Sequence, residues 1–203
     1  MAMKEFINST AKKGNDMEQQ YTIIQHGKCK KQYPNVILPQ RGRGFFGIGI
    51  EYPHTAKNIG TLWRSAHIMQ ADFIFVIGQD YQYVCTDTLK SWKHIPLFEF
   101  ESFEHFHASL PKDAKLVGIE LDTRSVPLTT YQHPQRAVYL LGSERDGLSA
   151  EALDQCDDVV QIPGEYSLNV SVAGSIVLYD RLLKNGSFGE VCGVAPWMKD
   201  AGR

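Results

Sequence analysis

The sequence predicts an α/β fold whose mostly parallel sheet carries helices on both faces. Short unbroken apolar runs, such as Phe73–Ile77, are typical of strands that are buried on both faces. Most of these runs are followed by segments with helical periodicity, and an alternation of strands and helices is typical of parallel sheets. The composition agrees, because 43% of the 203 residues are hydrophobic and 22% are charged, as in ordinary globular domains.

The order of the expected elements follows from the spacing of apolar residues and from the Ser, Pro and Gly residues that mark where elements begin and end. The expected strands are Phe45–Ile50, Phe73–Ile77, Pro96–Phe100, Leu116–Leu121, Ala137–Leu141 and Val159–Ile162. The expected helices are Lys57–Gln70, Asp87–Trp92, Ser102–Leu110, Ser149–Cys156 and Asn169–Lys184. Ser102 and Ser149 stand where side-chain oxygens cap helix N-termini.

Chemistry is expected at one edge of this sheet. In open α/β sheets, ligands bind beyond the carboxyl ends of the strands, at a point where the strand order reverses. The loops after Ile50, Leu121, Leu141 and Ile162 are therefore the candidate sites.

The chain is expected to form one domain with two extensions. Residues 44–187 form the predicted domain, residues 1–43 a basic and irregular N-terminal extension, and residues 188–203 a C-terminal tail. Net charge is −2 overall, but the N-terminal extension is rich in Lys and Arg while the remainder is acidic. A basic leader suits contact with a polyanion such as RNA. The alternative is a solvated tail.

Several classes of protein are disfavoured by absent patterns. The four cysteines form no C-x-x-C pair and no ligand-spaced cluster with histidine, so no metal site is expected and free thiols in a reducing cytoplasm are the simplest interpretation. No apolar stretch is long enough to span a membrane, and no signal peptide is visible. The glycines of the G-x-G-x-x-G match at 42–47 run into a strand rather than follow one, which disfavours a dinucleotide site.

Three segments are unusual for a purely structural chain. The first is residues 58–66, NIGTLWRSA, on a predicted helix; the second is residues 140–149, LLGSERDGLS, after a strand; the third is residues 162–174, IPGEYSLNVSVAG. Each also has an ordinary interpretation: an exposed arginine on a helix, a flexible polar loop, and a capped helix start.

Together and in this order, the three segments resemble the SpoU/TrmH family of RNA ribose methyltransferases, within the SPOUT superfamily. The first family motif, N-x-G-x-x-x-R-x-A, is matched by Asn58, Gly60, Arg64 and Ala66. The second, L-G-x-E-x-x-G-L, is matched by Leu141, Gly142, Glu144, Gly147 and Leu148. The third, I-P followed by S-L-N-V-S-x-A, is matched by Ile162, Pro163, 167–171 and Ala173. The resemblance covers residues 45–185.

The resemblance implies a deep trefoil knot in the C-terminal part of the sheet and S-adenosylmethionine bound there in a bent form. It also implies an RNA substrate, tRNA or rRNA, and a homodimer formed through the helix at 169–184. Carried onto this chain, the residues that would bind the cofactor are Glu120, Leu121, Leu141, Gly142, Ser143, Ile162, Ser167 and Leu168.

The resemblance further implies a catalytic set of Arg64, Asn58, Glu144 and Asn169. The family gives the matching arginine the role of base, but a guanidinium stays protonated, so Arg64 could instead clamp an RNA phosphate. Asn58 and Asn169 are expected to orient Arg64 or the substrate. Glu144 is expected to pair with Arg64 or to fix the start of the helix.

Two alternatives stay open beside the methyltransferase. One is a catalytically inactive RNA-binding or assembly protein on the same fold, which the intact motif residues disfavour. The other is a different α/β enzyme with a nucleotide-like cofactor, which the failed dinucleotide match and the missing phosphate loop disfavour.

Overall fold

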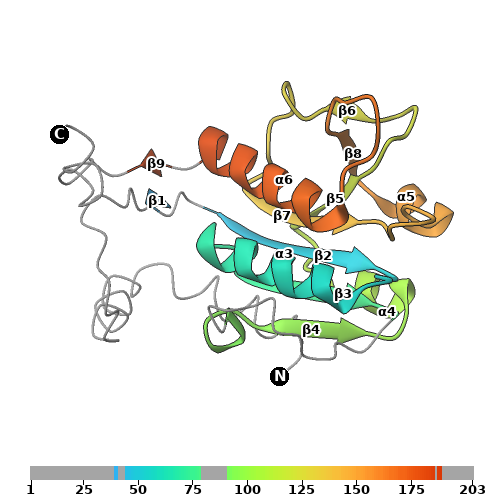
Figure 1. Ribbon diagram of the computed structural model, residues 1–203, viewed down its shortest axis with the longest axis horizontal. Helices are drawn as coiled ribbons and strands as arrows, with labels where there is room; N and C mark the ends of the chain where they lie inside the picture. The colour runs from blue at the N-terminus through green and yellow to red at the C-terminus, as the bar shows by residue number, and fades with distance from the viewer. Residues whose placement is uncertain (1–38, 41–43, 79–90, 186, 189–203) are drawn as a thin grey trace, which may run out of the picture.

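The fold is built on a seven-stranded sheet in which every described pairing is parallel (Figure 1). A computed structural model describes residues 39–40, 44–78, 91–185 and 187–188. The strand order is β4-β3-β2-β7-β5-β8-β6. The strands are β2 (Phe45–Glu51), β3 (Phe73–Ile77), β4 (Leu97–Phe100), β5 (Lys115–Ile119), β6 (Val126–Pro127), β7 (Arg136–Leu141) and β8 (Asp158–Gln161).

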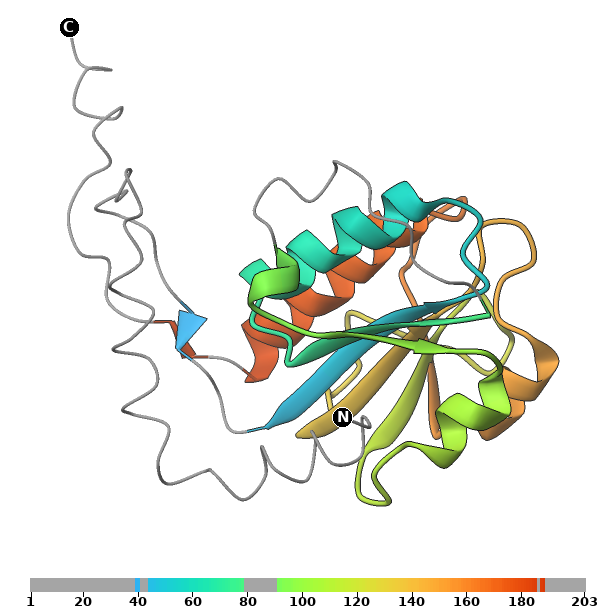
Figure 2. The same cartoon turned by 90° about the horizontal axis from the view of Figure 1, so that it is seen from below.

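Helices cover both faces of the sheet, as the sequence predicts. Figure 2 shows α3 (Ala56–Ile68) and α6 (Val170–Asn185) on one face, with α4 (Phe103–Ala108) and α5 (Ala150–Gln155) on the other. Side chains alternate along β3 accordingly: Ile74 and Val76 pack beneath α3, whereas Phe73 and Phe75 join the aromatic core under α4. The two cores are separate, so each face is held by its own apolar cluster.

The expected elements agree with the observed ones to within a few residues. Both predicted caps are confirmed, because Ser102 Oγ accepts from His105 N at 3.2 Å and Ser149 Oγ accepts from Ala152 N at 3.1 Å. Of the helix expected over 87–92, residues 87–90 lie outside the described residues, and Ser91–Lys93 form a 3-10 turn, η1.

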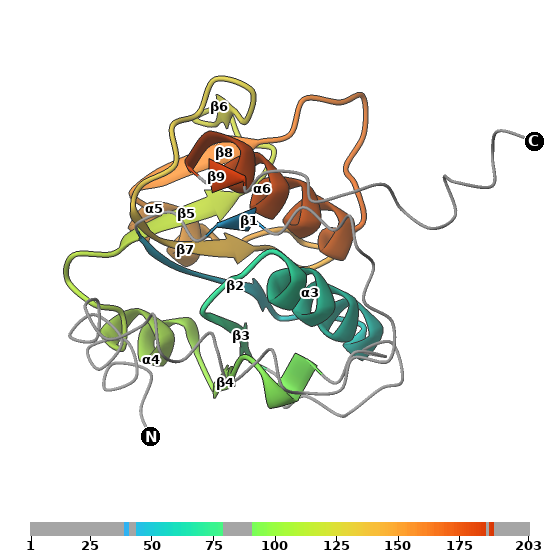
Figure 3. The same cartoon turned by 90° about the vertical axis from the view of Figure 1, so that its left-hand side faces the viewer.

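Two pairings were not expected from the sequence. The two-residue strand β6 pairs with β8, and β1 (Pro39–Gln40) pairs antiparallel with β9 (Ser187–Phe188), beside each other in Figure 3. Strands this short leave no apolar period in the sequence. The chain entering the domain and the chain leaving it therefore lie side by side.

The chain order around β8 is unusual. β6 belongs to the connection between β5 and β7, yet β8, which comes later in the chain, lies between β5 and β6. β8 therefore lies in the sheet between β5 and β6, although the chain that joins β5 to β6 comes earlier in the sequence.

A buried polar network anchors the C-terminal half of α6 to that same connection. Arg181 is only 4% exposed, and its guanidinium donates to the carbonyl of Pro134 at 2.6 Å and to the hydroxyl of Tyr139 at 3.0 Å. His133 lies within hydrogen-bond distance of Tyr139 Oη, at 2.6 Å, and of Asp180 Oδ2, at 2.8 Å. Burial lowers the pKa of His133. These bonds satisfy groups that would otherwise be costly to bury.

Within the part of the chain that the structure describes, no helix is both long enough and apolar enough to cross a membrane.

Candidate functional site

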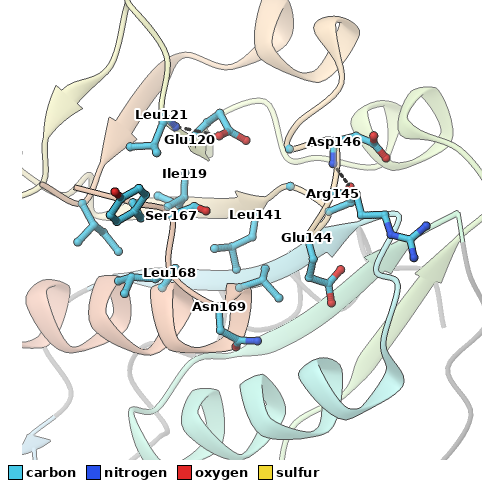
Figure 4. Close-up of a pocket in the computed structure, with 17 residues that line it drawn as sticks. Ile119, Glu120, Leu121, Leu141, Glu144, Arg145, Asp146, Ser167, Leu168 and Asn169 are labelled. Atoms are coloured by element: carbon cyan, nitrogen blue, oxygen red, sulfur yellow. Dashed lines mark hydrogen bonds between the residues drawn. The ribbon is translucent and has the colours of Figure 1, made fainter. Parts of the chain in front are cut away.

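A pocket of about 540 Å³ opens at the carboxyl edge of the sheet (Figure 4). Its walls come from the chain after β5, the loop after β7, the segment after β8 and the first turn of α6. This is the edge at which the sequence predicts the chemistry. The volume lies within the range of small-molecule sites.

The pocket gathers the predicted cofactor-binding residues. All eight line it: Glu120, Leu121, Leu141, Gly142, Ser143, Ile162, Ser167 and Leu168. Glu144 and Asn169, from the predicted catalytic set, line it as well. The chain after β5, the loop after β7 and the segment after β8 are distant in sequence and share this one cavity. The roles of their residues stay predictions.

The loop after β7 closes tightly on itself. Ser143 N donates to Gly147 O at 3.0 Å, and Gly147 N donates back to Ser143 O at 3.2 Å. A Cβ on Gly142 would lie 2.1 Å from the carbonyl carbon of Gly147 and 2.3 Å from Leu148 N. Because these neighbours are backbone atoms, they cannot swing aside, and the turn requires glycine at 142.

Two carboxylates hold the far end of this loop from either side of β7. Glu51, at the end of β2, is 1% exposed and accepts from both the N–H and the hydroxyl of Ser149, each at 2.8 Å. Glu120, just after β5, accepts from Leu148 N at 2.8 Å and from Leu121 N at 2.9 Å. The strands that flank β7 thus fix the pocket loop through charge-assisted hydrogen bonds.

A second polar network joins the pocket to the start of α3. Asn58 Nδ2 donates to Glu144 Oε1, and Asn169 Nδ2 donates to Asn58 Oδ1 at 3.1 Å. His54 N donates to Glu144 Oε2 at 2.9 Å. Partial burial disfavours the charge on Glu144, but the hydrogen bonds that it accepts outweigh this effect, so its pKa is lowered. Glu144 therefore carries a negative charge at neutral pH.

This geometry brings together three of the four predicted catalytic residues. Asn58 is hydrogen-bonded to both Glu144 and Asn169. Glu144 accepts its bonds from Asn58, in the first turn of α3, and from His54 N, just before the helix. Arg64 is not among the lining residues; it is exposed on α3, six residues after Asn58. Six residues of helix correspond to roughly 9 Å of rise. The proposed role of Arg64 thus requires either an RNA that extends beyond the pocket of its own copy or action at the pocket of a second copy.

Other lining residues were not predicted from the sequence to bind the cofactor or to act in catalysis. They are Ile119, Arg145, Asp146, Gly147, Tyr166, Val170 and Ala173. Glu51 was also missed, although a charged residue at the end of a buried strand is a signal that could have identified it.

Fold and pocket together define an α/β protein with a pocket of small-molecule size at the carboxyl edge of a parallel sheet. A family model, the SpoU rRNA Methylase family, matches residues 46–179. The chain belongs to this family.

Individual relatives agree with this assignment. The chain is 28% identical over 136 residues to mouse (Mus musculus) tRNA (guanosine(18)-2'-O)-methyltransferase TARBP1, covering 61% of this chain and 8% of that protein. It is 38% identical over 69 residues to 23S rRNA (guanosine-2'-O-)-methyltransferase RlmB of Acinetobacter baylyi, covering 32% of this chain and 28% of the relative.

A solved structure shares the fold. It is an AdoMet-bound rRNA methyltransferase from Sinorhizobium meliloti, 25% identical with a TM-score of 0.63, and the match covers 74% of this chain and 60% of that one. The chain thus spans less than two thirds of the length of each of these three relatives.

Proposed function

We propose that this protein transfers a methyl group from S-adenosylmethionine to a ribose 2'-hydroxyl of RNA, either tRNA or rRNA. The observation that carries the proposal is the pocket lined by the second and third motif segments, to which Asn58 of the first is hydrogen-bonded, in a chain of the SpoU family. The names of its relatives support both parts, since they include 2'-O-methyltransferases of tRNA and rRNA and a protein bound to AdoMet.

The residues of the pocket fit this cofactor. Leu141, Ile162 and Leu168 offer apolar surface for its adenine and methylene groups, and the closed turn at Gly142 exposes backbone groups for hydrogen bonding. Glu120 and Glu144 bring negative charge to the cavity, which suits a cation. When bound, the cofactor supplies a methyl group activated by a positively charged sulfonium.

The other reacting group is a ribose hydroxyl, a very weak acid whose proton must pass to solvent water as its oxygen attacks. A guanidinium is a poor general base, so Arg64 serves as an electrostatic clamp. Held against an RNA phosphate, its charge stabilises the oxyanion that forms on the sugar. Asn58 and Asn169 orient the sugar, and Glu144 holds the Asn58 amide in place.

The proposal is tested by incubating the protein with methyl-tritiated S-adenosylmethionine and bulk tRNA or rRNA. We expect label in RNA that survives mild alkali as alkali-resistant dinucleotides, because a methylated 2'-oxygen blocks strand cleavage at that position. Label only on bases would contradict the ribose assignment. Tight cofactor binding without any transfer would instead support the inactive RNA-binding alternative.

We also propose that the chain forms a trefoil knot. The position of β8 inside the connection from β5 to β7 supports it, as does the network that ties α6 to residues 128–135. Pulling on both ends of the unfolded protein with optical tweezers should give a contour length shorter than that of a linear chain. A full-length contour would contradict the knot.

The exposed side of α6 supports a homodimer. Val172, Tyr179 and Leu183 are exposed at spacings of seven and four residues, and so lie on one face of the helix. We propose that a second copy of the chain covers this stripe. Tyr179→Glu should raise the dimer dissociation constant by roughly two orders of magnitude, because an unpaired charge in an apolar interface is costly.

Light scattering across a dilution series measures that constant. Tyr179→Phe, which keeps the apolar ring, is the matched control and should behave as the natural protein. A Tyr179→Glu variant with an unchanged dimer mass would refute this interface.

A further inference from the structure

A cluster of cationic and aromatic side chains lies outside the pocket, at the far end of α3. The turn η1 supplies Trp92, Lys93 and His94, and α3 supplies His67. Figure 2 shows η1, just ahead of β4, against the end of α3 where the helix finishes. We name these four residues the Trp92 surface.

Three side chains of the Trp92 surface are exposed, whereas His67 is half-buried, with Nδ1 3.3 Å from Oγ of the buried Ser91. Trp92 is 49% exposed, and Lys93 Nζ lies 5.0 Å from the centroid of its ring. The imidazoles of His67 and His94 stack with centroids 4.3 Å apart and planes 13° from parallel. Among the described residues, no carboxylate lies within 4 Å of Lys93 to neutralise its charge. An exposed indole with a cation beside it therefore offers a stacking face and a positive charge to a partner.

Helix α3 connects this surface to the pocket. Asn58 lies at the pocket end, bonded to Glu144 and Asn169, and His67 follows nine residues later. Nine residues of helix span roughly 13 Å. Asn58 and His67 project from opposite sides of the helix, whereas Arg64 and His67 are three residues apart and therefore neighbours on one face. An RNA strand held by Arg64 would meet the Trp92 surface next.

We propose that the Trp92 surface binds single-stranded RNA next to the phosphate that Arg64 holds. This inference rests on the proposed function and names the form of its substrate. An aromatic face offers a stacking platform to an unpaired base, and adjacent cations hold the phosphates. A duplex cannot use the indole in this way, because its bases are already stacked.

The test compares four variants by anisotropy of a fluorescein-labelled 12-nucleotide oligouridine and of a 12-base-pair RNA duplex. Trp92→Ala should weaken oligouridine binding about tenfold, because the stacking of one base on the indole is lost. Trp92→Phe should retain most of the affinity. Lys93→Ala should reduce the slope of log affinity against log salt by about 0.7, the value for one phosphate on a single strand. Lys112→Ala, an exposed lysine elsewhere, is the control for lost charge and should change neither quantity.

Intrinsic fluorescence gives an independent readout. Oligouridine should quench tryptophan emission of the natural protein, and the quenching should shrink in Trp92→Phe while its affinity is kept. Thermal unfolding of each variant should match the natural protein, since Trp92 and Lys93 are exposed.

Three results for Trp92→Ala would overturn the inference. They are an unchanged affinity for oligouridine, an equal loss of affinity for oligouridine and for duplex, and a loss of self-association while RNA binding stays intact. These outcomes are separable from failure of the proposed function. If the protein methylates RNA and Trp92→Ala leaves its RNA affinity unchanged, the proposed function stands and the RNA-binding role of the Trp92 surface is wrong. A protein that transfers no methyl group, but whose RNA affinity depends on Trp92, retains the surface.

Discussion

Replacing Arg64 with alanine should reduce turnover on RNA by about 10²–10³-fold while leaving the dissociation constant for S-adenosylmethionine unchanged. The size is that of losing one charged group that stabilises a developing oxyanion. The cofactor should be unaffected because Arg64 lies outside the residues that line the pocket. Single-turnover transfer of tritium measures the rate, and calorimetry measures cofactor binding.

Arg64→Lys is the matched control for charge. It should recover part of the rate, since a lysine keeps the positive charge but loses the planar fork that grips a phosphate. Mixing Arg64→Ala with a variant that cannot bind cofactor then locates the contribution of Arg64. Activity regained in the mixture indicates that Arg64 acts at the pocket of the other copy. An Arg64→Ala protein with normal turnover would refute the catalytic assignment.

Gly142→Ala should weaken cofactor binding by about 10- to 100-fold or abolish it. The new methyl group would lie 2.1 Å and 2.3 Å from backbone atoms of the opposing arm of the loop. Forcing extra atoms into a closely packed position typically costs about 1–3 kcal/mol. The loop would have to open, and with it the wall of the pocket between Leu141 and Glu144.

Gly164→Ala is the control for a lost glycine near the same site. Its Cβ would meet only Tyr166 O, at 3.5 Å, which is an ordinary contact. It should bind cofactor normally by calorimetry. Both variants are first compared by thermal unfolding, so that a loss of fold is distinguished from a loss of binding. Equal cofactor affinity in the two variants would show that cofactor binding does not need the closed turn at Gly142.

Local patterns were sufficient to predict most of the elements. Unbroken apolar runs such as Phe73–Ile77 predicted the strands because both faces of this sheet are covered. The serines at 102 and 149 predicted two helix starts because capping depends only on residues three positions apart. The pairing of Val126–Pro127 with β8 could not be predicted, because two residues carry no period and their partner is 34 positions away.

Part of the candidate site could likewise be predicted from the sequence, and part could not. The membership of Glu120, Gly142 and Ser167 in one pocket followed from motif resemblance and is confirmed by the geometry. The bonds of Glu51 to Ser149, and of Asn58 to both Glu144 and Asn169, could not be predicted. They join residues about 90 to 110 positions apart, and only the strand order brings their atoms within 3.1 Å.

The sequence by itself determined the α/β class, the edge of the sheet that carries the site, and the family motifs, because each depends on local spacing or residue identity. Tertiary structure alone decided that β8 lies inside an earlier connection, that the start of α3 is tied to the pocket loop, and that Arg64 lies outside the pocket. The physical reason is that hydrogen bonds and packing act over a few ångströms in space, whereas the order of residues constrains distances only between near neighbours in the chain.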